Sequence, residues 1–456
     1  MPDKAKILIS IPHDQEVDSF PFSDLPFSNN FRRIYNSLNS EGILGKLEQS
    51  VMPADVPQFY VYACQRSSGE NKVNVSYGFG GSEDESRAII SSIGEAVEHY
   101  CILHERKDFF IHNAYEKLKS EAIDPLRFVP FTQKQLKSKR YKKFNISHSD
   151  SINWLEGYSL TNCKKVLLPA SLAYANYSCK KHNELGIIRM PISTGAACGP
   201  SLDSAINRGI CEIIERDGYM ISFLPQMPKR IILIDKFNTE LSDFIRRFTR
   251  YNFELYFIDT TLDSKVFSVV CLLIDRSGSG PAVCAGLGGG FVPTNAIKTS
   301  AIEALRRYVS DRNSFFRSEG HSSLKKYSFE WFIRNKHKVW SAPHMIKLVE
   351  DLVKNAKKTK LPREIFINNE KEKRKYLTEK LKSLGCELFY IDMTIPEVDK
   401  QGLKVVKVLC PEMVPLWYDE RYPYFGMERL ITVPEKSDIK VNLNLNVKEL
   451  TNIHPF

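Results

Sequence analysis

AINRGICEIIER, residues 205–216, occurs in altered form at two other places in the chain. The related segments are AIISSIGEAVEH at 88–99 and AIKTSAIEALRR at 296–307. Each starts with an Ala-Ile pair, carries a glutamate seven residues after the alanine, and follows a glycine-bearing stretch. An internal repeat of this kind indicates copies of one structural unit. We therefore expect one large domain built around three such units rather than three separate domains.

Each repeat is predicted to be an amphipathic helix preceded by a turn. Positions 1, 5 and 9 after the alanine share one helix face, and positions 3, 7 and 10 lie about 180° away. The first face is apolar and holds Ile89, Ile93, Val97, Ile206, Ile210, Ile214, Ile297, Ala301 and Leu305. The second face is polar and holds Ser91, Glu95, Glu98, Arg208, Glu212, Glu215, Thr299, Glu303 and Arg306. The expected turns are the glycine-bearing stretches 77–82, 193–201 and 285–291, with N-caps at Asp84, Asp203 and Asn295.

The polar faces point to a shared site. One such helix alone is an ordinary surface helix, but three copies could bring five glutamates around one cavity. Those anions would repel each other, so the cavity would need cations, and Mg²⁺ prefers oxygen ligands and usually arrives with a phosphate. The glycine-bearing turns could approach that phosphate, and Arg208, Arg216, Arg306 and Arg307 could add positive charge. No Walker loop is present, so the sequence predicts a Mg-nucleotide site of an uncommon type.

The composition is that of a globular protein. Of the 456 residues, 43% are hydrophobic and the net charge is +10, which argues against whole-chain disorder. No apolar run approaches the roughly 20 residues of a membrane span, and the start does not read as a signal peptide. The ten cysteines lack metal-binding spacing and are expected to be mostly buried thiols. We expect a soluble cytoplasmic protein whose basic runs at 134–143, 354–363 and 371–375 are solvated surface, and nucleic-acid binding is not indicated.

The remaining pattern predicts mixed α and β structure, of the α+β class. Residues 1–60 are expected to form an N-terminal extension, and residues 61–456 the main domain, with insertions at about 108–150 and 320–375. The first insertion reads as polar surface, and 325–360 as a lysine-rich helical region packed through Trp331, Phe332 and Trp340. Expected strands lie at 6–11, 59–77, 266–274 and 401–411.

Several motifs together resemble the YcaO family of ATP-dependent enzymes, which activate peptide-backbone amides. They are Gly42-Ile43, SxxxExxE at Ser91, Glu95 and Glu98, Ser193-Thr194-Gly195, ExxERD at Glu212, Glu215, Arg216 and Asp217, Glu303 with Arg307, Gly426-x-x-Arg429, and the strand ending at Pro411. The resemblance covers roughly residues 36–456 and implies mixed sheets and helices with internal repeats around an ATP/Mg site.

The resemblance also implies roles for individual residues. Glu95, Glu98, Glu212 and Glu215 would hold Mg²⁺, and Ser91, Arg208, Glu303 and Arg307 would help to bind ATP. Arg307 would contact a phosphate during catalysis, and His454 or the terminal carboxylate of Phe456 would act as general base. The chain departs from the family pattern at Phe79, where a lysine is common, at His99, where an arginine is usual, and at Arg208, which is often uncharged elsewhere. The tail 453–456 keeps one proline of the usual proline-rich end.

The activity implied is formation of thiazolines or oxazolines in a ribosomally made precursor peptide. A Cys, Ser or Thr side chain would attack the preceding amide, and ATP would phosphorylate the resulting oxyanion, which then leaves as phosphate. The implied partners are a separate leader-binding protein resembling adenylating enzymes, a flavin-dependent dehydrogenase and a second copy in a homodimer. Two alternatives remain open: thioamide formation with a sulfur-delivery protein, and a non-catalytic ATP-binding scaffold. Cys198 is expected to be a structural thiol.

Overall fold

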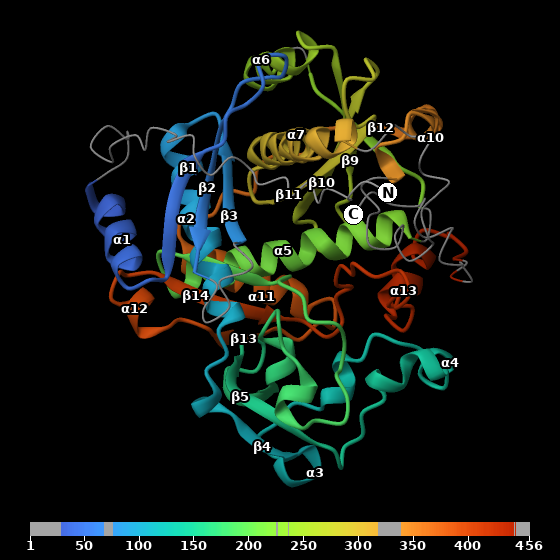
Figure 1. Cartoon of the computed structure of the whole chain (residues 1–456). Coiled ribbons are helices and arrows are strands. Elements are labelled where there is room, and N and C mark those ends of the chain that lie inside the picture. Colours follow the sequence, from blue (N-terminus) through green and yellow to red (C-terminus); the bar gives the residue numbers. More distant parts are fainter. Residues whose placement is uncertain are drawn as a thin grey trace, which may run out of the picture.

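The computed structural model describes residues 29–67, 76–224, 227–235, 237–317, 339–441 and 443. Three sheets and three long helices organise these residues, which confirms the α+β class (Figure 1). The helices are α2 (Glu85–Leu103), α5 (Leu202–Phe223) and α7 (Pro293–Arg317), and each contains one of the repeats. Figure 1 shows α5 crossing the middle of the molecule, between the strands β9, β10 and β11 on one side and β13, β5 and β4 on the other.

The first sheet is a three-stranded antiparallel meander that packs against α2. Its strands, in spatial order, are β1 (Leu44–Gln49), β2 (Tyr60–Arg66) and β3 (Ser76–Ser82). The helix α1 (Asn29–Ser40) precedes it and buries Ile34, Tyr35 and Leu38 against it. The strand predicted at 59–77 is therefore two strands, β2 and the start of β3, while the strand predicted at 6–11 lies outside the described residues.

The second sheet has five strands and lies between α5 and α7. In spatial order they are β11 (Val283–Gly290), β10 (Phe267–Asp275), β9 (Phe253–Asp259), β8 (Arg230–Leu233) and β12 (Lys357–Lys360), and only β12 joins in parallel. All nine residues of β10 are buried, because alternate side chains pack toward α5 and toward α7. The strand predicted at 266–274 is confirmed. The helices α6 (Thr239–Thr249) and α10 (His344–Lys354) complete this part.

The third sheet has six strands and packs against the other side of α5. Its strands are β4 (Ile111–Ala114), β5 (Ser151–Ser159), β13 (Phe389–Asp392), β14 (Lys404–Leu409) and β7 (Ala196–Gly199) in spatial order, with β6 (Lys164–Pro169) also paired to β5. The surrounding helices are α3 (Tyr115–Leu118), α4 (Gln133–Leu136), α11 (Glu370–Lys382), α12 (Pro396–Asp399) and α13 (Arg429–Glu435). Short 3-10 turns occupy Lys107–Phe109, Pro125–Phe128, Lys139–Phe144, Ala170–Leu172 and Cys179–His182.

Glycines let two of the repeat helices lie unusually close to their strands. A Cβ added at Gly80 in β3 would stand 1.9 Å from the carbonyl oxygen of Ala88 in α2, and one at Gly286 in β11 would stand 2.1 Å from that of Ser300 in α7. The predicted turns at 77–82 and 285–291 are thus wrong, since both stretches are mostly strand. Glycine is uncommon in strands, and its use here reflects close helix packing rather than a turn.

The helix starts also differ in part from the prediction. Asp84 caps α2, as predicted, by accepting a hydrogen bond from Arg87 N at 2.8 Å. The cap of α5 is Ser201, so Asp203 lies in the first turn, where it pairs with Arg374 at 2.7 Å. Asn295 likewise lies inside the first turn of α7, because that helix already begins at Pro293.

The two predicted insertions contribute to the core as well as to the surface. In 108–150 the lysines of the basic run are exposed, but four aromatic residues of the segment are buried and three of these pack against Tyr422 and Tyr424. The buried set is Phe128, Phe131, Tyr141 and Phe144. The second region, 325–360, is predicted from the sequence to be a lysine-rich helical region. It holds α10, but it also holds the strand β12, and Trp340 is buried while Trp331 and Phe332 lie outside the described residues.

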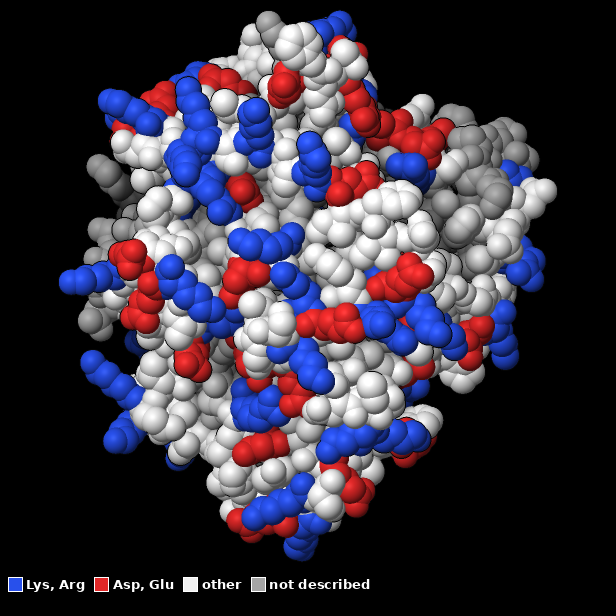
Figure 2. All heavy atoms as spheres, turned by 180° about the vertical axis from the view of Figure 1, so that it is seen from behind, with Lys and Arg blue, Asp and Glu red and all other residues white. Residues whose placement is uncertain are grey.

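The distribution of surface charge and the state of the cysteines agree with what the sequence predicts. Figure 2 shows basic and acidic side chains intermixed over one face of the molecule, with no large region of a single sign. All ten cysteines are free and seven of them are buried. Among the described residues, no helix combines the length and the apolar character that a membrane crossing requires.

Candidate functional site

The first glutamate of each repeat is held by a backbone N–H group of its own unit. Glu95 accepts from Phe79 N at 2.8 Å, Glu212 from Gly195 N at 3.1 Å, and Glu303 from Leu287 N at 2.8 Å. The donors lie in or next to β3, β7 and β11, each of which lies at an edge of its sheet. An edge strand leaves N–H groups without a ladder partner, so they are free to bind side chains.

Three of the five glutamates, Glu95, Glu98 and Glu215, have pKa values that are raised in part by the other glutamates of the three helices. Burial raises the pKa of Glu95, and so do Glu303 and Glu212, while Arg306 opposes the shift. Burial raises the pKa of Glu98 well above its usual range, with further contributions from Glu212 and Glu95. The polar faces of α2, α5 and α7 therefore converge, as the repeat predicted.

Glu215 is a second carboxyl with a strongly raised pKa. Burial, with Glu303 and Glu212 adding to it and Arg216 opposing it, raises its pKa to about 8. It lies beside β11, because a Cβ at Gly289 would be 3.3 Å from its Oε2 atom. A carboxyl that is largely protonated at neutral pH without a metal would release that proton to solvent when a divalent cation binds.

Arg216 is the arginine that contacts two of these carboxylates. Arg216 lies 3.4 Å from Glu212 and 3.6 Å from Glu215, measured from Nη2 and Nη1 to the Oε1 atoms. Within the described part of the chain, Arg216 Nε is buried and has no hydrogen-bond partner. An excess of carboxylate oxygens next to an orphaned cationic donor fits a ligand that carries both metal and phosphate, such as Mg-ATP.

The departures from the family pattern also reduce positive charge near Glu95. Burial and the nearby Arg66 lower the pKa of His99 to about 4, so its imidazole is neutral although it lies 3.9 Å from Glu95. The Phe79 ring brings no charge of its own. The guanidinium of Arg306, from the third repeat, lies 5.2 Å from the centroid of that ring and supplies a cation there instead.

The other predicted residues lie at the edge of this cluster or outside the described residues. Ser91 and Arg307 are exposed on the helices that carry Glu95 and Glu303. Arg208 is exposed on α5 and donates to the Cys198 carbonyl at 3.4 Å. His454 and Phe456 lie outside the described residues.

Sequence reasoning missed two residues that face the cluster. Tyr418, in the segment after β14, has a largely exposed side chain but lies near the glutamates: desolvation of its hydroxyl, Glu212 and Glu303 raise its pKa, and Arg216 and Arg307 oppose the shift. Lys407, inside β14, also lies near Glu98 and Glu212: burial, with Arg189 adding to it, lowers its pKa to about 7, and these two carboxylates oppose the shift. No repeat motif contains either residue, and a lysine within an apolar strand was the one available signal.

The described residues hold two other polar groupings that lack the features of this site. Cys386, Cys410 and Glu412 bring their ligand atoms within 4.8 Å of one another. However, Glu412 already accepts bonds from Arg127 at 2.8 Å and from Glu387 N at 3.0 Å, which account for the carboxylate without a metal ion.

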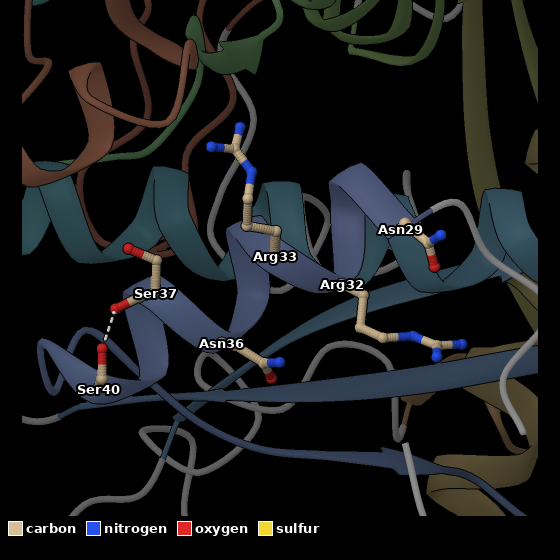
Figure 3. A pocket seen from close by; sticks show the side chains of 6 residues that line it. All are labelled: Asn29, Arg32, Arg33, Asn36, Ser37 and Ser40. Carbon is tan, nitrogen blue, oxygen red and sulfur yellow. Dashed lines mark hydrogen bonds between the residues drawn. The ribbon is translucent and has the colours of Figure 1, made fainter. Parts of the chain in front are cut away.

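The second grouping is a shallow groove along α1, whose lining side chains point in different directions (Figure 3). They are Asn29, Arg32, Arg33, Asn36, Ser37 and Ser40. All six come from a single helix, so groups from several elements do not converge there as they do at the glutamates.

Glu215→Gln is expected to stabilise the metal-free protein, and more so at about pH 8 than at about pH 5. The pKa of this carboxyl is raised from the usual 4.5 to about 8 on folding. Between these values the folded state holds the extra proton, so the free energy of unfolding falls as the pH rises. Glutamine removes that titration. Melting temperatures measured in a chelator at both pH values test this, with the exposed Glu379→Gln on α11 as control. An equal shift at both pH values would contradict it.

Three helices bring five carboxylates together at a site that suits a metal ion and a phosphate. This arrangement defines a class of nucleotide-binding protein that lacks a Walker loop. The family whose sequence model matches residues 77–414 is described as "YcaO cyclodehydratase, ATP-ad Mg2+-binding". The match covers most of the chain, so the protein belongs to the YcaO family, which binds ATP and Mg²⁺.

Solved structures share this fold. A "Heterocyclase in complex with substrate and Cofactor" matches with a TM-score of 0.70 and 20% identity, over 93% of this chain and 56% of that one. YcaO from Methanopyrus kandleri, bound with AMPPCP and Mg²⁺, matches with a TM-score of 0.60 and 16% identity, over 84% and 90%. The E. coli microcin synthetase McbBCD complex matches with a TM-score of 0.56 and 12% identity, over 80% and 87%. The chain spans just over half the length of the first of these proteins.

Proposed function

We propose that the protein is an ATP-dependent cyclodehydratase that forms thiazolines and oxazolines from Cys, Ser and Thr residues of a ribosomally made precursor peptide. The observation that carries the proposal is the convergence of the glutamates of α2, α5 and α7 on one site. Family membership supports it, and so does the likeness of the fold to solved heterocyclases. The retained glutamates argue against a non-catalytic scaffold.

The residues of the chain then have distinct tasks. Glu95, Glu98, Glu212 and Glu215 would hold Mg²⁺, while Ser91, Arg208, Glu303 and Arg307 would contact the nucleotide. Arg216 lies within 3.6 Å of two of these residues, Glu212 and Glu215, so its positive charge reduces the repulsion between their carboxylates. When bound, ATP supplies the phosphoryl group that activates the peptide oxygen. The general base would be His454 or the carboxylate of Phe456.

We also propose that the enzyme acts in the cytoplasm as part of a complex. The partners would be a separate leader-binding protein resembling adenylating enzymes, a flavin-dependent dehydrogenase that oxidises the rings, and a second copy of this chain. The likeness to one chain of the E. coli synthetase complex supports an assembly of this kind, because that protein works together with others.

Mass spectrometry of a precursor peptide tests the proposal. Incubation with the enzyme, the leader-binding protein and Mg-ATP is expected to remove about 18 Da for each residue cyclised, because one water is lost per ring. A control reaction with a chelator should leave the mass unchanged. A gain of about 16 Da per residue would instead show exchange of oxygen for sulfur, and an unchanged mass with Mg-ATP present would contradict an enzymatic role.

A further inference from the structure

Lys407 is a lysine in the middle of β14 whose side chain has no exposed surface. Its ammonium nitrogen donates to the carbonyl oxygens of Ile192, at 2.6 Å, and Thr194, at 2.8 Å. The next residue, Val408, donates its N–H to the carbonyl of Gly195 at 2.7 Å. Burying a lysine is unfavourable unless it is well bonded, so these contacts define a built site rather than a chance packing. Together they tie β14 to the turn at 192–195.

That turn carries the N–H group that holds Glu212. Gly195 N donates to Glu212 Oε2 at 3.1 Å. The glycine has φ +86°, and a Cβ there would lie 2.3 Å from the carbonyl oxygen of Val408. The position therefore requires glycine and is packed tightly against β14, so the orientation of Gly195 depends on the position of β14.

The three repeats differ at this point. In the first, the donor Phe79 lies inside β3 and is paired with Ala63 of β2; in the third, Leu287 lies inside β11 and is paired with Val270 of β10. In the second, the donor precedes β7, which begins at Ala196. There the donor residue is held to β14 by the bond from Val408 N to the Gly195 carbonyl, and the ammonium of Lys407 adds two further bonds to the segment that leads into it.

We propose that Lys407 is a positioning residue, which fixes the turn at 192–195 so that Gly195 N–H holds Glu212 in the orientation that metal binding requires. The inference rests on the proposed Mg-ATP site. Lys407 acts through the turn and touches neither nucleotide nor metal. The carboxyls and cations that face it are Glu98, Glu212 and Arg189.

A matched pair of variants tests this role. Lys407→Met removes the donor, and Lys229→Met is the control, because Lys229, although only half-buried, also donates to two carbonyls, those of Ser222 and Met227. Ser222 lies ten residues after Glu212 on α5, or about 15 Å along the helix, so this control leaves the glutamates alone. Should Lys407→Met fail to fold, Lys407→Gln, which keeps a smaller donor, replaces it.

Two measurements are made on the full chain. Calorimetric binding of AMPPCP with and without Mg²⁺ should show the metal-dependent affinity reduced about tenfold or more by Lys407→Met, as for loss of a group that orients a metal ligand, with metal-free nucleotide binding unchanged. Hydrogen exchange should rise at 192–196 in the same variant. Lys229→Met should change neither quantity.

The outcomes separate the inference from the proposed function. Unchanged Mg²⁺ dependence in Lys407→Met, or unchanged exchange at 192–196, overturns the positioning role. An equal fall in binding with and without Mg²⁺ also overturns it, since that would be a general structural effect. If the unaltered protein binds AMPPCP no better with Mg²⁺ than without, the proposed Mg-ATP site itself fails.

Discussion

Glu212→Gln is expected to reduce Mg-dependent ATP turnover by on the order of 100-fold or more. Glu212 is the central charge of the cluster, because it affects the pKa values of Glu95, Glu98 and Glu215. Glutamine has nearly the same shape and can still accept the hydrogen bond from Gly195. The substitution therefore removes a charge from the metal site and leaves the local structure in place.

Phosphate release in the presence of the precursor peptide and the leader-binding protein measures the effect. Glu379→Gln, an exposed glutamate of α11, is the control and should retain full turnover. Glu95→Gln should behave like Glu212→Gln, since Glu95 is held by the same kind of backbone bond in its own repeat. Unchanged turnover in both variants would contradict the assignment of these carboxylates as metal ligands.

Arg429→Met should destabilise the fold by about 3–5 kcal/mol, the usual range for breaking a buried ion pair. Arg429 is buried and donates to Asp217 at 2.7 and 3.1 Å and to Asp263 at 2.8 and 3.1 Å. Asp217 belongs to the ExxERD motif of α5 and also accepts from Val414 N at 2.9 Å. Without the arginine, a buried carboxylate would be left uncompensated between α5 and α13.

Urea unfolding measures this effect, with a surface ion pair as the control. Arg276 pairs with Glu254 and Glu350 on the surface, so Arg276→Met should change stability by no more than about 1 kcal/mol. Adding Asp217→Asn to Arg429→Met should recover part of the loss, because the orphaned charge is then removed. A similar loss from both arginine substitutions would contradict a special role for the buried pair.

The sequence predicted those parts of the fold and site that depend on local periodicity. The apolar positions of the repeats, such as Ile89, Ile210 and Ile297, are buried in the structure, and the opposite faces converge. Helical spacing decides both results, because residues three or four apart must share a face.

What the sequence could not predict depends on contacts between distant segments. The pairing of Asp217 with Arg429 joins residues 212 positions apart, and the bonds of Lys407 depend on the register of β14 against the segment before β7. The strand character of the glycine stretches follows from how closely α2 and α7 approach them, which no local pattern encodes. The prediction that Asp203 and Asn295 are N-caps is wrong by about two residues, because the helices begin earlier, after Ser201 and at Pro293.

The strand β12 bears on how copies of this protein could associate. It is the last strand of the five-stranded sheet, and the side chains of Lys357, Lys358 and Lys360 are exposed along it. An unpaired strand edge invites a strand from a second molecule, but closely spaced lysines repel a like-charged copy and discourage continuous sheet formation. A homodimer of this protein should therefore form through another surface, and this sheet should resist growing into an intermolecular aggregate.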